Sequence, residues 1–265
     1  MDQSPHLTPE RNIEELWSDY QDGKTQSVFA EAEQMLAQNP SAEQRADLHA
    51  LKAWCCYQEK NFSGALEEAL QAGQRHIKGL EVQAFLRAYE GSPFRDEQML
   101  INLSKVLPEG NLSVLKAMII SARVDGSELE PERILSQGEK FIQDFDPQKA
   151  SGSDTNLINN LSRLTQTIAE REGDSVMMNR AVVLMERAIE GYGKESNWAH
   201  RGAAFFHLSR MHESLGNSFE AFTAAEHSAW MWDEQYNIQP SELNKNRSEG
   251  AEKRARELQG KLSFR

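Results

Sequence analysis

The sequence has few of the features that mark secreted or membrane-spanning proteins. It contains two cysteines and eight prolines in 265 residues, and no window approaches the run of about 18 apolar residues that a membrane helix needs. Its start, MDQSPHLTPERN, also lacks a basic region followed by an apolar stretch. We therefore expect neither a secretion signal nor a membrane span, and we predict a cytoplasmic protein.

The two cysteines, Cys55 and Cys56, are adjacent in a segment with helical periodicity. Neighbouring side chains on a helix point about 100° apart, so this pair cannot close an ordinary disulfide. We predict that both are reduced thiols that are buried or half-buried.

Positive charge is also scarce. The chain has 29 Lys and Arg against 41 Asp and Glu, which gives a net charge of -12. Proteins bind nucleic acids and anionic membranes mainly through Lys and Arg, so we expect neither as a partner. The charge is unevenly distributed, because residues 245–265 contain seven Lys and Arg but three Glu.

The sequence lacks the common catalytic and metal-binding motifs. We find no GxGxxG, P-loop, GxSxG or HExxH pattern and no paired Cys motif. The spacing of His200, His207 and His212 prevents the three from sharing one helical face. We therefore expect no metal site, no cofactor and no enzymatic activity.

What the sequence does contain is a pair of amphipathic helical patterns in residues 205–229. Phe205, Leu208 and Ser209 have helical spacing and are followed by a Gly216-Asn217 break. A second helical pattern places small or aromatic residues on one face, at Phe222, Ala225 and Ala229. This segment predicts a helix, a tight turn and a second helix.

Similar pairs recur along the chain. Their first apolar residues are separated by 35, 34, 33, 46 and 44 residues and are Ile13, Leu48, Val82, Leu115, Leu161 and Phe205. Residues 205–229 resemble a tetratricopeptide repeat, whose period is about 34 residues. The resemblance lies in an aromatic residue, an aliphatic residue followed by a small one, the Gly-Asn pair and the later small residues. The resemblance implies an all-α, right-handed superhelix of about six hairpins with a C-terminal capping helix.

The expected organisation follows from these repeats and from local composition. Residues 1–10 are expected to be a flexible tail, and residues 11–146 to form four hairpins. The segment PQKASGSDTN at residues 147–156 has the composition of a linker. Residues 157–238 are expected to form two more hairpins, and residues 239–265 a basic capping helix and tail.

In a tetratricopeptide array the first helix of each hairpin lines a concave groove, and this geometry nominates partner-binding residues. The nominated residues are Arg87, Lys116, Arg123, Arg210, His49, Gln83, Gln166 and Phe206. The same geometry places Asn159 and Ser162 in the groove. The four cations among them indicate a basic strip that holds an acidic segment or a carboxylate, although ordinary exposed helix positions would give the same pattern.

Some tetratricopeptide proteins bind a chaperone's C-terminal carboxylate through a Lys, Asn, Asn, Lys, Arg constellation spread over three consecutive repeats. Lys116 and Arg163 could supply members of it, but the asparagines are not in matching places. We therefore do not assign that activity to this chain.

The leading interpretation is a non-enzymatic adaptor that binds a peptide or helix of another protein in the groove. Two alternatives remain open. One is head-to-tail self-assembly into a homo-oligomer, if the terminal helix leaves an apolar end uncovered. The other is a regulatory sensor that binds a small peptide or signalling ligand.

Overall fold

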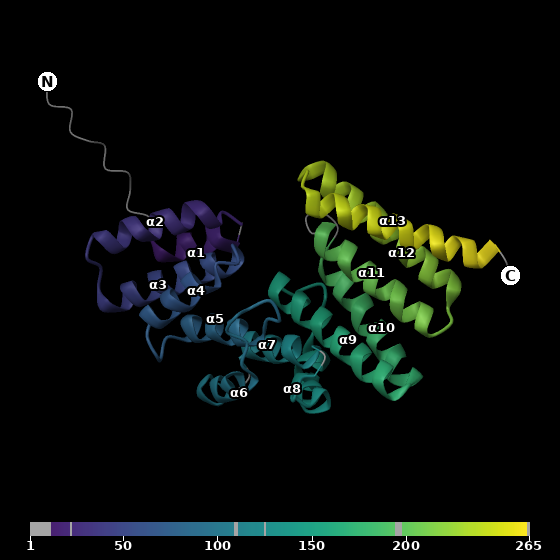
Figure 1. Ribbon diagram of the computed structural model, residues 1–265, viewed down its shortest axis with the longest axis horizontal. Helices are drawn as coiled ribbons and strands as arrows, with labels where there is room; N and C mark the ends of the chain where they lie inside the picture. Colours follow the sequence, from purple (N-terminus) through teal and green to yellow (C-terminus); the bar gives the residue numbers. More distant parts are fainter. Residues whose placement is uncertain (1–11, 22, 109–110, 125, 194–197, 264–265) are drawn as a thin grey trace, which may run out of the picture. The chain divides into compact units, whose positions relative to one another are not determined.

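A computed structural model describes residues 12–21, 23–108, 111–124, 126–193 and 198–263, and these residues form an all-α protein (Figure 1). The predicted tail at residues 1–10 lies outside the described residues. None of the described helices has the length and apolar character needed to cross a membrane. The helices are α1 (Ile13–Gln21), α2 (Thr25–Ala37), α3 (Ala42–Gln58), α4 (Phe62–Gln71), α5 (Ile77–Ala88), α6 (Glu97–Val106), α7 (Leu112–Ala122), α8 (Pro131–Asp144), α9 (Gly152–Glu172), α10 (Ser175–Gly191), α11 (Trp198–Ser214), α12 (Ser218–Ile238) and α13 (Glu242–Ser263).

Short polar signals fix where these helices begin and end. The Ser41 side chain accepts a hydrogen bond from the Gln44 backbone in a capping box at the start of α3. Gly173 ends α9 in the left-handed conformation, with φ of 67°. Asp174 then caps α10 by accepting hydrogen bonds from two backbone N–H groups. The turn between α9 and α10 is therefore encoded by an adjacent Gly and Asp.

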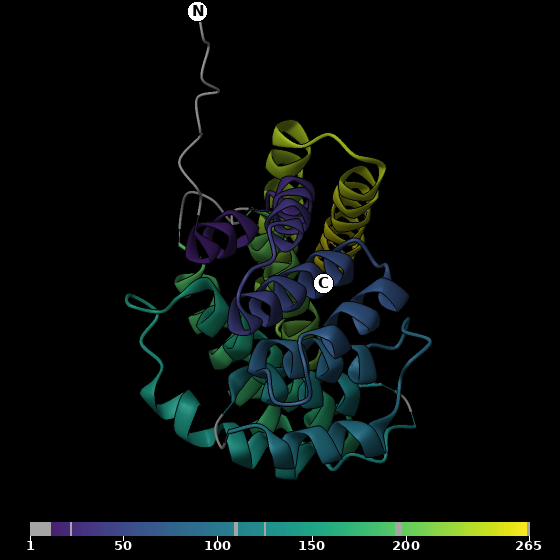
Figure 2. The ribbon, with the colours of Figure 1, turned by 90° about the vertical axis from the view of Figure 1, so that its left-hand side faces the viewer.

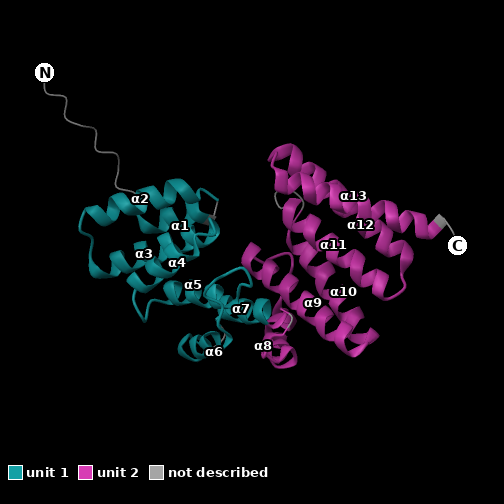
Figure 3. Cartoon of the chain, in the orientation of Figure 1, with its two compact units in different colours: residues 1–121 teal, residues 122–265 magenta. Residues whose placement is uncertain are grey.

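The chain divides into two compact units, residues 1–121 and 122–265 (Figure 3). This division differs from the one expected at the linker, residues 147–156. The second half of that segment is helical, because α9 begins at Gly152. Ser151 and Asp154 form a capping box there, so residues whose composition suggested a linker instead start a helix.

The first unit is built around small and aliphatic residues of α1 to α5. One cluster of buried side chains joins α1, α2 and α3 and includes Leu16, Val28 and Leu51. A second joins α3, α4 and α5 and includes Ala65 and Val82. Cys55 and Cys56 are free and buried within these clusters, as predicted.

The second unit stacks its helices in chain order, with α8 against α9, α9 against α10, α10 against α11 and α11 against α12. A buried serine links the two helices of each of its last two hairpins. Ser162 Oγ donates to the Ala181 carbonyl at 2.7 Å, and Ser209 Oγ donates to the Ala221 carbonyl at 2.7 Å. The two hairpins therefore share one kind of contact, a serine of the first helix bonded to a backbone carbonyl of the second.

The basic helix expected near the C-terminus is α13, which lies beside α12 (Figure 1 and Figure 2). It buries Ala251 and Leu258 and reaches α11 through polar contacts. Arg254 Nε donates to Ser209 Oγ at 2.9 Å, and Arg254 and Lys261 both bind the Glu213 carboxylate. The face of α12 that carries Ala221 and Ala225 is therefore covered by a helix that is also tied to α11.

Candidate functional site

Four of the nominated groove residues lie in the first unit, where three already have roles in packing. Gln83 is buried, and His49 Nδ1 is 2.6 Å from a Glu68 carboxylate oxygen. Arg87 donates to the Phe94 carbonyl at 2.8 Å and so holds the segment before α6. Lys116 is half-buried near the Phe85 ring, and burial lowers its pKa.

The other four nominated residues lie in the second unit. Gln166 is buried and donates to Glu170 at 2.8 Å. Phe206 faces the guanidinium of Arg254, which lies 5.6 Å from its ring centre. Arg123 is half-buried and Arg210 is exposed. Because the four nominated cations are divided between the two units, the basic strip as one continuous surface stays a prediction.

Arg123 and Arg210 belong to a larger group in the second unit, which we call the arginine cluster: Arg123, Arg163, Arg210 and His207. Arg123 follows the last residue of α7, Arg163 lies on α9, and the other two lie on α11, which contacts α9. Their charges act on one another. Burial, and then Arg163, lower the pKa of Arg123 to about 9, and burial and Arg210 lower the pKa of Arg163.

All three arginines of the cluster act electrostatically on His207 and affect its pKa. Burial lowers the pKa of His207 to about 3, with further contributions from Arg163, Arg123 and Arg210. At neutral pH the imidazole is therefore neutral, whereas Arg123, the arginine with a pKa of about 9, remains protonated. The cluster thus combines three positive charges with one neutral ring that can donate a hydrogen bond.

None of the three arginines is paired with a carboxylate anywhere in the described ranges. The Nε atoms of Arg123 and Arg163 are buried and have no hydrogen-bond partner there. Nearby arginines of the same unit behave differently, because Arg180 binds Glu139 at 2.6 Å and Arg254 binds Glu213 at 3.0 Å. Half-buried cations that lack a counter-ion are costly, so this arrangement is unusual for a purely structural cluster.

The rim of the cluster supplies further polar groups. Asn159 lies one turn before Arg163 on α9, and its Nδ2 donates to the Tyr192 hydroxyl at 2.9 Å. Its Oδ1 is buried without a partner among the described residues. Burial raises the pKa of Tyr192 to about 12, so this hydroxyl stays neutral. The Tyr192 hydroxyl in turn donates to Asn156 Oδ1 at 2.8 Å, so the donors of this rim are engaged with one another, and the rim includes no activated nucleophile.

Sequence reasoning did not place Arg163 or His207 in the groove. It nominated Ser162 instead, but that side chain is buried between α9 and α10, and its neighbour Arg163 points to the cluster. A signal was present, because Leu161-Ser162-Arg163 recurs as Leu208-Ser209-Arg210. Arg123 likewise follows a small buried residue, Ala122. An arginine thus follows a small buried residue three times: directly after α7, within α9 and within α11.

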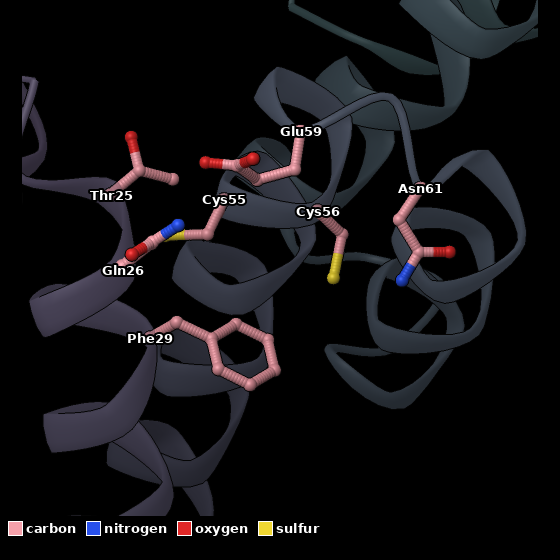
Figure 4. Close-up of a pocket in the computed structure, with 7 residues that line it drawn as sticks. All are labelled: Thr25, Gln26, Phe29, Cys55, Cys56, Glu59 and Asn61. Carbon is pink, nitrogen blue, oxygen red and sulfur yellow. The ribbon is translucent and has the colours of Figure 1, made fainter.

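A cavity of about 350 Å³ lies in the first unit, between α2 and the end of α3 (Figure 4). Its lining residues are Thr25, Gln26, Phe29, Cys55, Cys56, Glu59 and Asn61. Burial raises the pKa of the Cys55 thiol to about 12 and also raises that of Cys56. Both thiols are therefore protonated at neutral pH and are poor nucleophiles or metal ligands. Across the described residues no group of three or more His, Cys, Asp or Glu is placed to hold a metal ion.

Comparisons with known proteins add little beyond the class of fold. No family model matches the chain, and no curated protein matches it. It is similar to the crystal structure of a de novo designed helical repeat protein, with 20% identity over 96% of this chain and 98% of that chain. The TM-score of 0.23 is too low to support an argument about the arrangement of the helices. Membership of the tetratricopeptide family therefore stays a prediction.

Proposed function

We propose that the chain is a non-enzymatic, cytoplasmic adaptor that binds an acidic segment of another protein through its second unit. The observation that carries this proposal is the arginine cluster, in which Arg123 and Arg163 are half-buried and have no carboxylate partner among the described residues. Stacked helical hairpins commonly serve as binding surfaces. A cluster of arginines on such a surface is one of the recurrent ways to recognise an acidic motif.

The physical basis of binding would be charge-assisted hydrogen bonding. A guanidinium presents five N–H donors in a rigid plane and can grip a carboxylate with two parallel hydrogen bonds. Because Arg123 and Arg163 are partly withdrawn from water, their attraction for an anion is less screened than that of an exposed lysine. His207 would add a neutral N–H donor. The acidic remainder of the chain would disfavour anions that do not reach this patch.

The remaining nominated residues fit the same adaptor function as secondary contacts. In the second unit, Phe206 lies beside the cluster on α11 and would contact an apolar group of the partner. In the first unit, Lys116 is the half-buried cation available for a second acidic group, while His49, Gln83 and Arg87 shape the surface through their internal bonds. Head-to-tail self-assembly is less favoured, because α13 covers α12.

The test is capture of partners by the native protein and by an Arg210→Glu variant. Arg210 is exposed and has no carboxylate partner in the described parts of the chain, so its reversal should leave folding intact. The matched control is Arg256→Glu on α13, whose side chain is 71% exposed. We expect at least one protein to be recovered with the native form and the control but lost with Arg210→Glu. Equal recovery with all three would contradict the proposal.

A further inference from the structure

The arginine cluster offers more charge and more donors than one carboxylate can use. A carboxylate carries one negative charge on two oxygens, whereas a phosphoryl group carries about -1.5 to -2 on three acceptor oxygens at neutral pH. Three guanidiniums with no counter-ion among the described residues match the second group better than the first. The match concerns both the number of charges and the number of acceptor atoms.

The placement of the arginines supports one shared ligand rather than three separate ones. Each lies on, or directly after, the first helix of a hairpin and follows a buried small residue: Ala122, Ser162 or Ser209. Since α9 contacts α11, Arg163 and Arg210 lie on adjacent helices, and Arg123 is close enough to act on Arg163. The Nε atoms of Arg123 and Arg163 are buried and unpaired among the described residues, so a ligand would be held by the terminal N–H groups of these guanidiniums.

We propose that the arginine cluster binds a dianionic phosphoryl group carried by the partner segment, as a phosphorylated Ser, Thr or Tyr side chain. This inference rests on the proposed function, because it names the chemical group through which the adaptor recognises its partner. Asn159 and Tyr192 are bonded to each other on the α9 side and bound the site there, and His207 adds a donor from α11. Binding would then depend on phosphorylation of the partner.

The neutral state of His207 favours this assignment. A protonated imidazole would add a fourth positive charge to three that already repel one another. The neutral ring instead contributes an N–H donor without further repulsion. The three arginine charges remain to discriminate between ligands, so a dianion should be preferred over a monoanion of the same shape.

The first experiment uses phenyl phosphate and phenyl sulfate as probes of the full chain. The two have similar shapes but differ in charge, and calorimetric titration at pH 7.5 and constant ionic strength compares them. We expect phenyl phosphate to bind at least about tenfold more tightly than phenyl sulfate. Equal affinities, or no binding of phenyl phosphate, would overturn the assignment of a dianion.

An Arg163→Gln variant separates a ligand site from a structural role. It should weaken phenyl phosphate binding at least about tenfold, because it removes the central guanidinium. It should also raise the Tm by about 2–4 °C, since a half-buried, uncompensated charge is lost. An Arg256→Gln control should change neither quantity. A variant that loses stability and keeps its affinity would show that Arg163 is a structural residue.

A second experiment distinguishes failure of this inference from failure of the proposed function. The capture that depends on Arg210 is repeated after the cell extract has been treated with phosphatase. Loss of the captured protein supports the phosphoryl assignment, whereas unchanged capture overturns it and leaves the adaptor proposal standing. If phenyl phosphate binds but no capture depends on Arg210, the adaptor proposal and the partner-borne source are both wrong, and the ligand is a free phosphorylated molecule.

Discussion

Each of the two units contains a poorly exposed cation, but the two cations differ in whether a carboxylate lies beside them. In the first unit, Lys52 is 7% exposed, and its Nζ lies 2.7 Å from a Glu68 oxygen and 3.5 Å from Glu33. Burial alone would lower the pKa of Lys52, but the hydrogen bond and attraction to Glu68, helped by Glu33, outweigh it and raise that pKa. In the second unit no carboxylate of the described residues offsets the burial of Arg163, and its pKa is lowered.

Burial of a charge therefore does not by itself mark a functional site. Where the chain supplies the counter-ion, as Glu68 does for Lys52, the pair belongs to the core. Where the chain supplies none, the folded state carries a cost that an external anion can remove. Perturbed groups of this second kind are candidates for binding sites, and Arg163 is one of them.

Removing the counter-ion in the first unit should have the largest effect on stability. Glu68→Gln leaves the buried ammonium of Lys52 without its main partner and also breaks the contact with His49. We expect the free energy of unfolding to fall by about 3 kcal/mol, as for other broken buried ion pairs. Urea unfolding followed by tryptophan fluorescence would measure it.

The matched control for this change is Glu33→Gln. Glu33 is 57% exposed and lies 3.5 Å from Lys52, so its loss should cost about 0.5 kcal/mol or less. If both variants are destabilised equally, or neither is, then Glu68 is not the main counter-ion of Lys52, and the contrast with Arg163 is wrong.

The next largest effect should be a pH dependence that arises in the second unit. The pKa of His207 in the folded state, about 3, is lower than the value of about 6.5 for an exposed histidine, so the unfolded chain binds the proton first. The stability that this provides is complete above about pH 6.5 and is lost as the pH falls. The loss at pH 5 is roughly 2 kcal/mol at most.

A His207→Gln variant should lose less stability than the native protein between pH 7 and pH 5. Urea unfolding at both values tests this, because the contributions of all other groups cancel in the comparison. Between pH 8 and pH 7 the two proteins should behave in parallel. Parallel behaviour at acid pH as well would show that His207 does not sit in the field of the three arginines.

The smallest predicted effect comes from giving the second unit a counter-ion of its own. Asn159→Asp places a carboxylate one turn before Arg163, where an i,i+4 pair of opposite charges can form. The new pair should add about 0.5 kcal/mol to the unfolding free energy, which the loss of the Asn159 hydrogen bond to Tyr192 offsets. The affinity for phenyl phosphate should fall, because the added charge neutralises the site. Unfolding and calorimetry would measure the two effects. Unchanged phosphate affinity would argue against a ligand site at this position.

The helical fold could be predicted from the sequence because it depends on local periodicity and on turn residues such as Gly173 and Asp174. The start of α9 within residues 147–156 could not be predicted, since Ser151 and Asp154 suit both a loop and a helix N-terminus. Which side chains form the site depends on how each helix is rotated about its axis, and the sequence does not determine this rotation to within one residue. A shift of one position exchanges Ser162 for Arg163, and the serine was identified as buried only when its bond to Ala181 was known.

The contact between α13 and Glu213 has a consequence for Arg210. Oppositely charged residues three positions apart on a helix are neighbours, so Glu213 would be the natural internal partner of Arg210 on α11. Its two oxygens are instead occupied by Arg254 and Lys261, at 3.0 and 2.6 Å. The terminal helix α13 thus binds Glu213, the acidic residue of that turn of α11, in place of Arg210. Through this competition, a helix that covers part of the array also leaves Arg210 available to a ligand.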